Sequence, residues 1–307
     1  MSKLYKVQTR FLFHSDIKLK IPVEFDDIVF DDLYSILEEV NEKYNSYSET
    51  SYISKINKNS GSFVEVNDET IEILEKVIYY SDKLNGEYDI TIMPLIKLWG
   101  FYKKNPQKIP LKEEIEEIKK LVNYKNIQID KKNKRVKIEK NQEIITGSFI
   151  KSYAVDKMFI KMKEIGITDA IVNAGGSTIV ALNDSDNTEW GIIVEGDGED
   201  LFDINISNES YSTSNQLNTY IAINGEKYGH ILSPKTGYPS QNKQIGIVTE
   251  SAFIGDIIST GLYNQTLQNF SKLMKKLSDE IKIEGFLMDK NNEIFYSEGF
   301  SNYIENK

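Results

Sequence analysis

Apolar residues recur with two different spacings along this chain, and segments of the two kinds interleave without a regular strand–helix–strand alternation. Spacings of three and four residues predict amphipathic helices. The predicted helices cover 31–43, 70–84, 111–121, 154–165 and 266–276. Short runs rich in β-branched and aromatic residues predict strands. The predicted strands cover 17–23, 127–129, 135–138, 170–172, 179–182, 191–194, 220–223, 246–248 and 286–288.

This irregular interleaving favours a mixed α+β fold over a doubly wound α/β fold. No Pro/Gly/Ser-rich linker interrupts the 307 residues, which contain only six prolines, so we expect one large domain over 1–307. For the helix starts, Ser152 is the expected cap of the fourth helix, and Asp68 or Thr70 that of the second.

Charge and cysteine content exclude several classes of function. The chain has 37 basic and 47 acidic residues, and a net charge of −10 opposes contact with phosphate backbones, so we expect no nucleic-acid partner. The absence of cysteine excludes disulfides, zinc–thiolate sites, iron–sulfur clusters and a thiol nucleophile. No stretch reaches the roughly 18 apolar residues of a membrane span. The first ten residues show neither a signal-peptide core nor a cysteine for lipidation, so we expect a cytoplasmic protein.

Two glycine-containing turns could contact a ligand. The run NAGGS at 173–177 lies between two predicted strands, and Gly175 and Gly176 would allow backbone amides to approach a phosphate or ribose. An ordinary hairpin turn explains these residues equally well. The run HILSPKTGYP at 230–239 predicts a tight turn with Gly237 at positive φ. His230, one of two histidines, could contact a ligand there or lie in the core.

Three further segments carry polar side chains beside apolar ones. If 252–262 is helical, Asp256 and Thr260 lie on one face as oxygen ligands for a hard cation such as Mg²⁺, or they simply hydrogen-bond to each other. Lys151 lies in the small-residue run 147–156 at a helix start, where it could bind a phosphate or be an ordinary exposed lysine. Trp99 and Phe101 end the run 86–101 and could be core residues.

Taken in order, these segments resemble the ApbE family of flavin transferases. The run YNSYSETSYISKIN at 44–57 is similar to the family's F-S-x-Y-x-x-x-S-E-I-S-x-L-N, and 86–101 resembles G-x-F-D-P-T-x-x-P-L-x-x-L-W-G-F. The runs GSFIKSYAVD and NAGGS resemble G-G-I-A-K-G-Y-A-V-D and N-A-G-G-D. The family's T-S-G resembles TSN at 213–215, and its H-I-x-D-P-x-T-G-x-P resembles the run at 230–239. The family's D-A-L-A-T-A-L resembles DIISTGL at 256–262. Each motif is weak alone, but the resemblance covers residues 13–300 in the family's order.

The resemblance implies an FAD:protein FMN transferase. Such an enzyme uses Mg²⁺ to cleave FAD, transfers FMN to a threonine or serine hydroxyl of an acceptor flavoprotein, and releases AMP. Asp256 and His230 would be the catalytic residues. The implied Mg²⁺ ligands are Ser148, Asp256 and Thr260. The implied FAD-binding residues are Tyr47, Asp89, Ile90, Thr91, Lys151, Asn173, Gly175 and Gly176.

The chain also departs from the family pattern at several positions around the expected nucleotide site. The family's Met-Gly-Thr near the N-terminus corresponds to 14–16, which reads His-Ser-Asp here. The other departures replace an acidic residue or a glycine: Ile145, Ser152, Ser177 and Ser233. They leave two alternatives open, a catalytically degenerate protein that binds FAD or a partner, and an FAD pyrophosphatase that transfers FMN to water.

Overall fold

The computed structural model of the chain describes residues 3–103, 108–196, 199–216 and 219–305. The helices in these ranges are α1 (Ile28–Tyr44), α2 (Tyr52–Lys58), α3 (Asp68–Lys83), α4 (Met93–Trp99), α5 (Lys112–Lys119), α6 (Ile150–Glu164), α7 (Ala252–Leu262) and α8 (Leu267–Ser278), with 3-10 turns η1 (Tyr124–Asn126) and η2 (Phe300–Asn302). The strands are β1 (Tyr5–Leu12), β2 (Ser15–Pro22), β3 (Val64–Glu65), β4 (Gln128–Asp130), β5 (Arg135–Lys137), β6 (Ala170–Ala174), β7 (Thr178–Leu182), β8 (Trp190–Gly196), β9 (Glu199–Ile206), β10 (Ser210–Asn215), β11 (Tyr220–Ile223), β12 (Glu226–Gly229), β13 (Gln244–Thr249), β14 (Ile283–Met288) and β15 (Ile294–Tyr296).

Every predicted helix and strand is present, so the mixed α+β prediction is confirmed. The predicted helix caps were wrong. Asn67 caps α3 by accepting a hydrogen bond from the Thr70 amide at 2.9 Å, which places Asp68 and Thr70 inside the helix. Helix α6 starts at Ile150, and the buried Ser152 hydroxyl donates back to the Phe149 carbonyl at 2.8 Å. A serine in the first turn can bond backward in this way, so serine alone does not locate a helix start.

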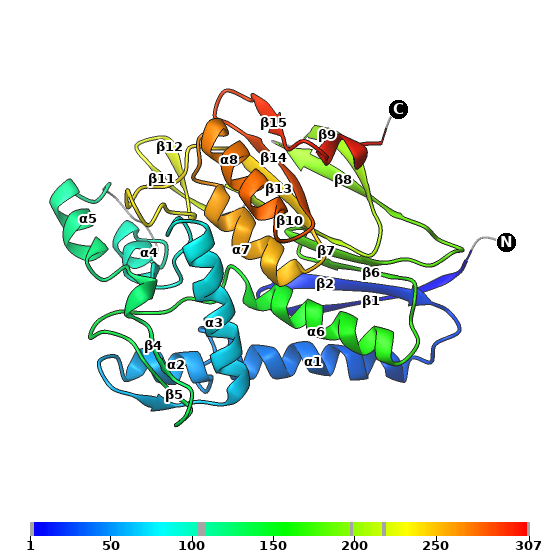
Figure 1. The fold of residues 1–307 in the computed structure, drawn as a ribbon, viewed down its shortest axis with the longest axis horizontal. Helices are drawn as coiled ribbons and strands as arrows, with labels where there is room; N and C mark the ends of the chain where they lie inside the picture. The colour runs from blue at the N-terminus through cyan, green and yellow to red at the C-terminus, as the bar shows by residue number, and fades with distance from the viewer. Residues whose placement is uncertain (1–2, 104–107, 197–198, 217–218, 306–307) are drawn as a thin grey trace.

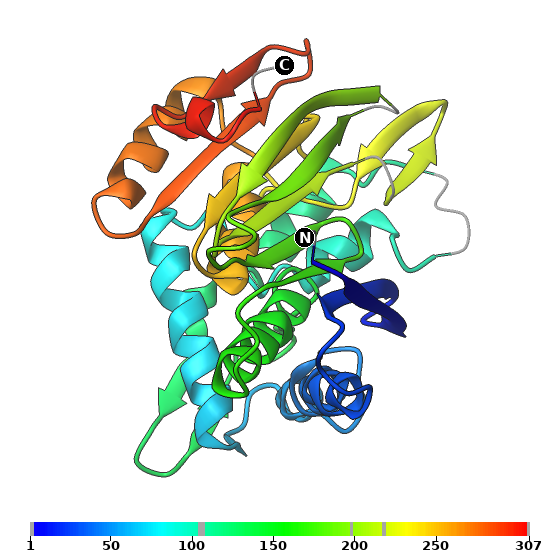
Figure 2. The ribbon, with the colours of Figure 1, turned by 90° about the vertical axis from the view of Figure 1, so that its right-hand side faces the viewer.

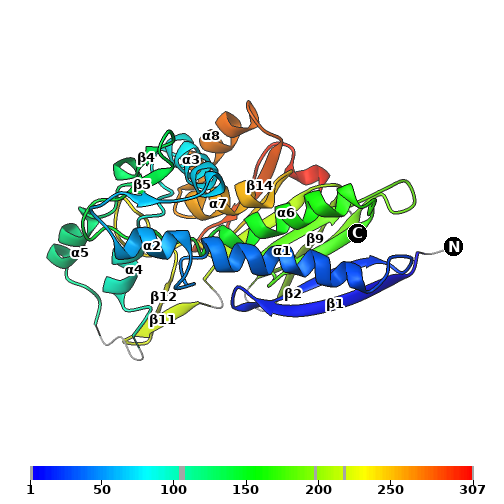
Figure 3. The same cartoon turned by 90° about the horizontal axis from the view of Figure 1, so that it is seen from below.

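An antiparallel sheet with the strand order β1-β2-β6-β7-β10-β13-β14-β15 forms the centre of the molecule (Figure 1). Helices α1, α6, α7 and α8 cover one face, and the β8–β9 ribbon with η2 covers the other (Figures 2 and 3). Strand β7 shows how both faces are filled. Ile179 and Ala181 pack under the ribbon, whereas Val180 and Leu182 pack under the helices, so the whole strand is buried.

A third apolar cluster joins α4, α5 and the β11–β12 hairpin beside the sheet. Trp99 is its largest side chain, 1% exposed, and its indole Nε1 donates to the Gly237 carbonyl at 2.8 Å. The core interpretation of Trp99 is therefore confirmed, and Gly237 has the predicted positive φ, at 78°. This bond ties the 86–101 segment to the turn that follows His230.

Helix α7 occupies the middle of the helical layer, against β10, β13 and α6 (Figure 1). The Ser251 hydroxyl caps it by accepting a bond from the Ile254 amide. Nearly all residues of α7 are buried, as expected of a helix with apolar residues around its whole circumference. Gly255 permits the close approach to the sheet, because a Cβ there would lie 2.7 Å from the Ser212 hydroxyl oxygen. No helix in the described ranges is long and apolar enough to span a membrane.

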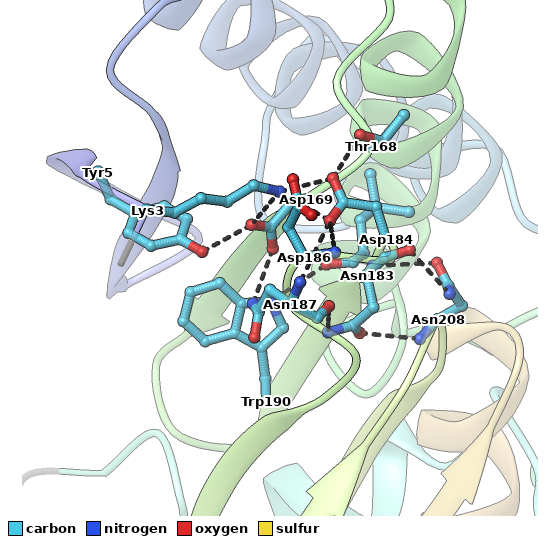
Figure 4. A network of polar contacts seen from close by, with 11 residues as sticks. Lys3, Tyr5, Thr168, Asp169, Asn183, Asp184, Asp186, Asn187, Trp190 and Asn208 are labelled. Carbon is cyan, nitrogen blue, oxygen red and sulfur yellow. Dashed lines mark hydrogen bonds and ion pairs between the residues drawn. The ribbon is translucent and has the colours of Figure 1, made fainter. Parts of the chain in front are cut away.

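A polar network joins the N-terminal segment to the far end of the β6–β7 hairpin (Figure 4). The Lys3 ammonium lies 3.1 Å from Asp169 and 2.6 Å from Asp184, and the Tyr5 hydroxyl donates to Asp169 at 2.6 Å. The Asp169 side chain is fully buried. A buried carboxylate needs such partners, because its ionised form otherwise loses hydration without compensation.

Replacing Lys3 should therefore destabilise the protein measurably. We expect Lys3→Met to lower the free energy of unfolding at pH 7 by about 2 kcal/mol, because Asp169 stays buried without its cation. The hydrogen bond from Lys3 lowers the pKa of Asp184 to about 2. Stability from a lowered carboxyl pKa exists above the unfolded value and disappears on acidification. The difference between wild type and variant in urea titrations should thus shrink from pH 4 to pH 2.

The exposed pair of Lys120 with Glu117 offers a control for this experiment. Lys120→Met should change the free energy of unfolding by less than about 0.5 kcal/mol, since surface ion pairs contribute little. An equal effect of the two substitutions would contradict the structural role of the Lys3 network.

Candidate functional site

The motif segments converge on one cavity of about 1020 Å³, at the upper end of volumes typical of ligand sites. Its walls come from the β1–β2 loop, the residues after α1, the start of α6, the β6–β7 turn, the 230–234 turn and α7. Antiparallel strands and their connecting turns thus gather segments that lie as far apart in the chain as Phe13 and Thr260. Eleven of the twelve predicted site residues line it: Tyr47, Asp89, Ile90, Ser148, Lys151, Asn173, Gly175, Gly176, His230, Asp256 and Thr260.

Asp256 supplies a buried carboxylate to the cavity wall. Residues 252–262 are helical, and α7 places Asp256 and Thr260 one turn apart, both at the cavity. The carboxylate accepts a hydrogen bond from the Thr178 hydroxyl at 3.0 Å. Burial raises the pKa of Asp256 to about 6, although the charge of Lys151 and neighbouring hydroxyl groups oppose the shift. The ionised carboxylate is thus poorly compensated by the protein itself, and a bound cation would stabilise it.

Lys151 points across the start of α6 toward the glycine turn. Its ammonium donates to the Ala174 carbonyl and to the Ser177 hydroxyl, both at 2.6 Å. Burial lowers the pKa of Lys151, and the negative charge of Asp256 works against that shift. Lys151 is therefore a half-buried cation at the cavity rather than an ordinary exposed lysine.

The glycine run is a hairpin turn between β6 and β7, and it also lines the cavity. Gly175 and Gly176 have φ of 69° and 74°, a region that favours glycine. A Cβ on Gly175 would lie 2.7 Å from the Ser15 Cβ, so the turn packs directly on the β1–β2 hairpin. The Asn173 side chain accepts a bond from the Gly176 amide at 2.8 Å and fixes the turn.

His230 also lines the cavity, half-buried, with its Nδ1 3.1 Å from the Thr219 carbonyl oxygen. A carbonyl oxygen can only accept, so Nδ1 carries the proton and Nε2 of the neutral ring keeps its lone pair. Burial lowers the pKa of His230, which favours this neutral form at pH 7.

Thr91 is the one predicted site residue outside the cavity lining. It is fully buried, donates to the Asp89 carboxylate at 2.6 Å and accepts from the Asn123 amide at 2.9 Å. Asp89 also accepts a bond from the Tyr124 amide at 2.9 Å. The two side chains therefore hold the backbone that presents Ile90 to the cavity.

Several lining or supporting residues were missed by sequence reasoning. The Tyr88 hydroxyl lies 2.8 Å from the Ser148 hydroxyl, and Thr178 bonds to Asp256. Tyr88 lies inside the 86–101 run and Thr178 directly follows the NAGGS run, and these positions are the signal that could have found them. The apolar wall from β8, which includes Ile192, Ile193 and Val194, has no comparable signal. Its position depends on the ribbon folding over the sheet.

Two departures from the family pattern keep a local bond. The Ser177 hydroxyl accepts from Lys151, and the Ser233 hydroxyl accepts from the Thr236 amide at 3.2 Å within its turn. Ile145 instead places an apolar side chain in the cavity wall. The cavity lining therefore still includes one ammonium, from Lys151, several hydroxyl groups, and the carboxylates of Glu87, Asp89, Glu195 and Asp256.

Solved structures of similar shape share this architecture. The ApbE protein of Thermotoga maritima superposes with a TM-score of 0.90 and 24% identity, covering 99% of this chain and all of that chain. The flavinyl transferase ApbE of Pseudomonas stutzeri superposes with a TM-score of 0.84 and 20% identity, covering 99% of each chain. These similarities show the fold.

Curated sequences extend the comparison to named enzymes. The FAD:protein FMN transferase of Haemophilus influenzae is 26% identical over 246 residues, which cover 76% of this chain and 71% of that protein. The FAD:protein FMN transferase of Vibrio cholerae is 26% identical over 235 residues, which cover 74% and 70%. The ApbE family model matches residues 12–283. This chain, with its site built from the motifs of that family, belongs to the ApbE family.

Proposed function

We propose that this chain is an FAD:protein FMN transferase that binds FAD in the cavity and transfers FMN to a threonine or serine hydroxyl of an acceptor protein. The observation that carries the proposal is the meeting of Asp256, Thr260, Ser148 and Lys151 at one large cavity in a member of the ApbE family. These groups suit phosphoryl transfer, which depends on positioning and charge neutralisation.

The donor set fits Mg²⁺. Asp256 offers a buried carboxylate, and Thr260 and Ser148 offer further oxygens at the same cavity. When bound, Mg²⁺ would neutralise charge on the pyrophosphate of FAD. In the described part of the chain no three acidic or histidine side chains form a metal cluster, so a cation here depends on hydroxyl, carbonyl and substrate oxygens as well.

The remaining roles follow from the geometry of the protein groups. Tyr47 and Ile90 provide walls for FAD, and Asp89 and Thr91 support the wall at Ile90. The turn that faces Lys151 is formed by Asn173, Gly175 and Gly176. The acceptor hydroxyl oxygen forms a bond to the FMN phosphorus as the bond from that phosphorus to the AMP oxygen breaks. The hydroxyl proton passes to Nε2 of His230, and AMP leaves.

A direct test is mass spectrometry of the reaction. The protein would be incubated with FAD, Mg²⁺ and a pool of peptides that each carry one central threonine. We expect two products in equal amounts, a peptide that carries FMN and free AMP. AMP and free FMN without any adduct would favour the pyrophosphatase alternative. Bound FAD that stays intact would favour the degenerate alternative, which the Ile145 departure makes worth testing.

Lys151 allows a separate prediction about substrate affinity. We expect Lys151→Met to raise the dissociation constant for FAD about tenfold or more, because the variant keeps the apolar stem but loses the half-buried charge at the cavity. Calorimetric titration of FAD would measure this. Lys161→Met, which removes an exposed partner of Glu164 on the same helix and away from the cavity lining, is the control and should leave FAD affinity within about twofold. If the Lys151 variant binds FAD as tightly as wild type, Lys151 does not contribute to the FAD site.

A further inference from the structure

The carboxylate of Asp156 joins the two helices that carry the site. Asp156 lies on α6, and its Oδ1 accepts a hydrogen bond from the Ala252 amide at 2.9 Å. Its Oδ2 accepts from the Phe253 amide at 3.1 Å and from the Ser251 hydroxyl at 2.6 Å. These three donors form the first turn of α7 and its cap. The first amides of a helix have no partner within the helix, so Asp156 caps α7 from a neighbouring helix.

The same two helices carry Lys151 and Asp256. Lys151 precedes Asp156 by five residues on α6, and Asp256 follows Ala252 by four residues on α7. Four residues of helix span about 6 Å, within which an α-helix is stiff. Any shift of the start of α7 relative to α6 is thus transmitted to the Asp256 carboxylate.

The rest of α7 makes close contacts with other parts of the fold. A Cβ on Gly255 would meet Ser212 and Thr249 of the sheet, and a Cβ on Gly261 would meet Leu84 and Tyr88. These contacts set the distance of α7 from the sheet and from the Tyr88 segment. The hydrogen bonds of Asp156 set its start relative to α6.

We propose that Asp156 is a positioning residue for the metal and nucleotide site, because its carboxylate fixes the start of α7 against α6 and so sets the separation of Asp256 from Lys151. The inference rests on the proposed function. Asp156 itself is not among the residues that line the cavity, so it acts through Asp256 rather than on a ligand.

Asp156→Asn is the informative substitution. Asparagine is nearly isosteric, but its amide nitrogen replaces one acceptor oxygen, so at least one donor of the α7 start loses its partner. We expect Mn²⁺, used as a spectroscopic substitute for Mg²⁺, to bind about 10- to 100-fold more weakly in the presence of FAD, the range for loss of an outer-sphere partner. In AMP-release assays kcat should fall with little change in KM for FAD.

Glu69→Gln is the matched control. The Glu69 carboxylate also holds α6, accepting bonds from Tyr153 at 2.7 Å and from Tyr44 of α1 at 2.8 Å and pairing with Lys157, so these bonds join it to α6 and α1 rather than to the start of α7. Both substitutions remove one negative charge and should lower the melting temperature. A purely structural role of Asp156 predicts the same Mn²⁺ affinity in the two variants, whereas the positioning role predicts weaker binding in Asp156→Asn alone.

Asp156→Glu covers the case in which Asp156→Asn does not fold. It keeps the charge and moves the carboxylate by one methylene, so the positioning role predicts Mn²⁺ binding at least about threefold weaker than wild type. Suppose that the wild-type protein binds Mn²⁺ and releases AMP. If every Asp156 variant that folds then binds Mn²⁺ as tightly as wild type, the role of Asp156 is overturned and the proposed function is not. Wild-type protein that binds no Mn²⁺ and releases no AMP would overturn the proposed function, and the inference with it.

Discussion

Asp256→Asn should abolish metal-dependent AMP release from FAD while leaving the folded protein at least as stable as wild type. The variant removes the only carboxylate among the proposed metal ligands, and we expect a loss of at least about 10³-fold in kcat/KM, as when a main electrostatic group of a catalytic site is removed. Chromatographic measurement of AMP with and without Mg²⁺ would establish the loss.

The stability part of this prediction follows from the raised pKa. A carboxyl pKa of about 6 in the folded state, against 3.8 as the reference value, means that folding disfavours the ionised form. Two pKa units correspond to about 3 kcal/mol at pH 7. This penalty is fully present above pH 6 and disappears as the pH falls toward 4. Metal-free Asp256→Asn should therefore melt at the wild-type temperature or above it at pH 7.5.

Asp130→Asn on the β4–β5 hairpin provides the control. Asp130 pairs with Arg135 at 2.7 Å and does not line the cavity, so its substitution should leave AMP release unchanged. Two results would contradict these roles of Asp256: full activity of Asp256→Asn, or a large decrease in the melting temperature of the metal-free variant.

His230→Gln should give the second largest effect, a decrease of about 10²- to 10⁴-fold in kcat for FMN transfer, the usual contribution of a general base. Glutamine can keep a hydrogen bond to the Thr219 carbonyl, but it cannot take up a proton. The affinity for FAD, measured by calorimetry, should stay within about threefold. Transfer kinetics on the best peptide acceptor would give kcat.

The pH profile separates a base from a merely polar residue. Burial lowers the pKa of His230 from 6.5, so the neutral ring persists at pH 7 and the wild-type rate should fall only on further acidification. His230→Gln should lose that part of the pH dependence.

His14→Gln is the matched control, since His14 is the other histidine and lines the same cavity, edge-on to Tyr47 at 5.9 Å. It should affect KM for FAD rather than kcat. An unchanged kcat in His230→Gln would contradict the assignment of the base.

Sequence periodicity predicted the elements with strong apolar patterns. Helix α1 buries residues at spacings of three and four, and α8 does the same, so both were predictable. Strand β10 was missed because its residues, Ser210–Asn215, are mostly small and polar. They are buried by close packing against α7, which local sequence does not reveal.

Most of the cavity could be predicted, but only as separate motifs. The order of the segments identified eleven lining residues, yet the wall from β8 depends on a ribbon that folds across the sheet. Thr91 shows the opposite case. Its motif position suggested a ligand contact, whereas its hydroxyl is occupied by Asp89 and Asn123.

Calorimetric titration of FAD into the wild-type protein, with and without Mg²⁺ and with AMP measured in the same samples, shows whether the cavity is a metal-dependent flavin nucleotide site. We expect FAD binding that tightens with Mg²⁺, and AMP release that requires Mg²⁺. Absence of FAD binding under both conditions would show that the cavity is not a flavin nucleotide site, although the chain belongs to the ApbE family.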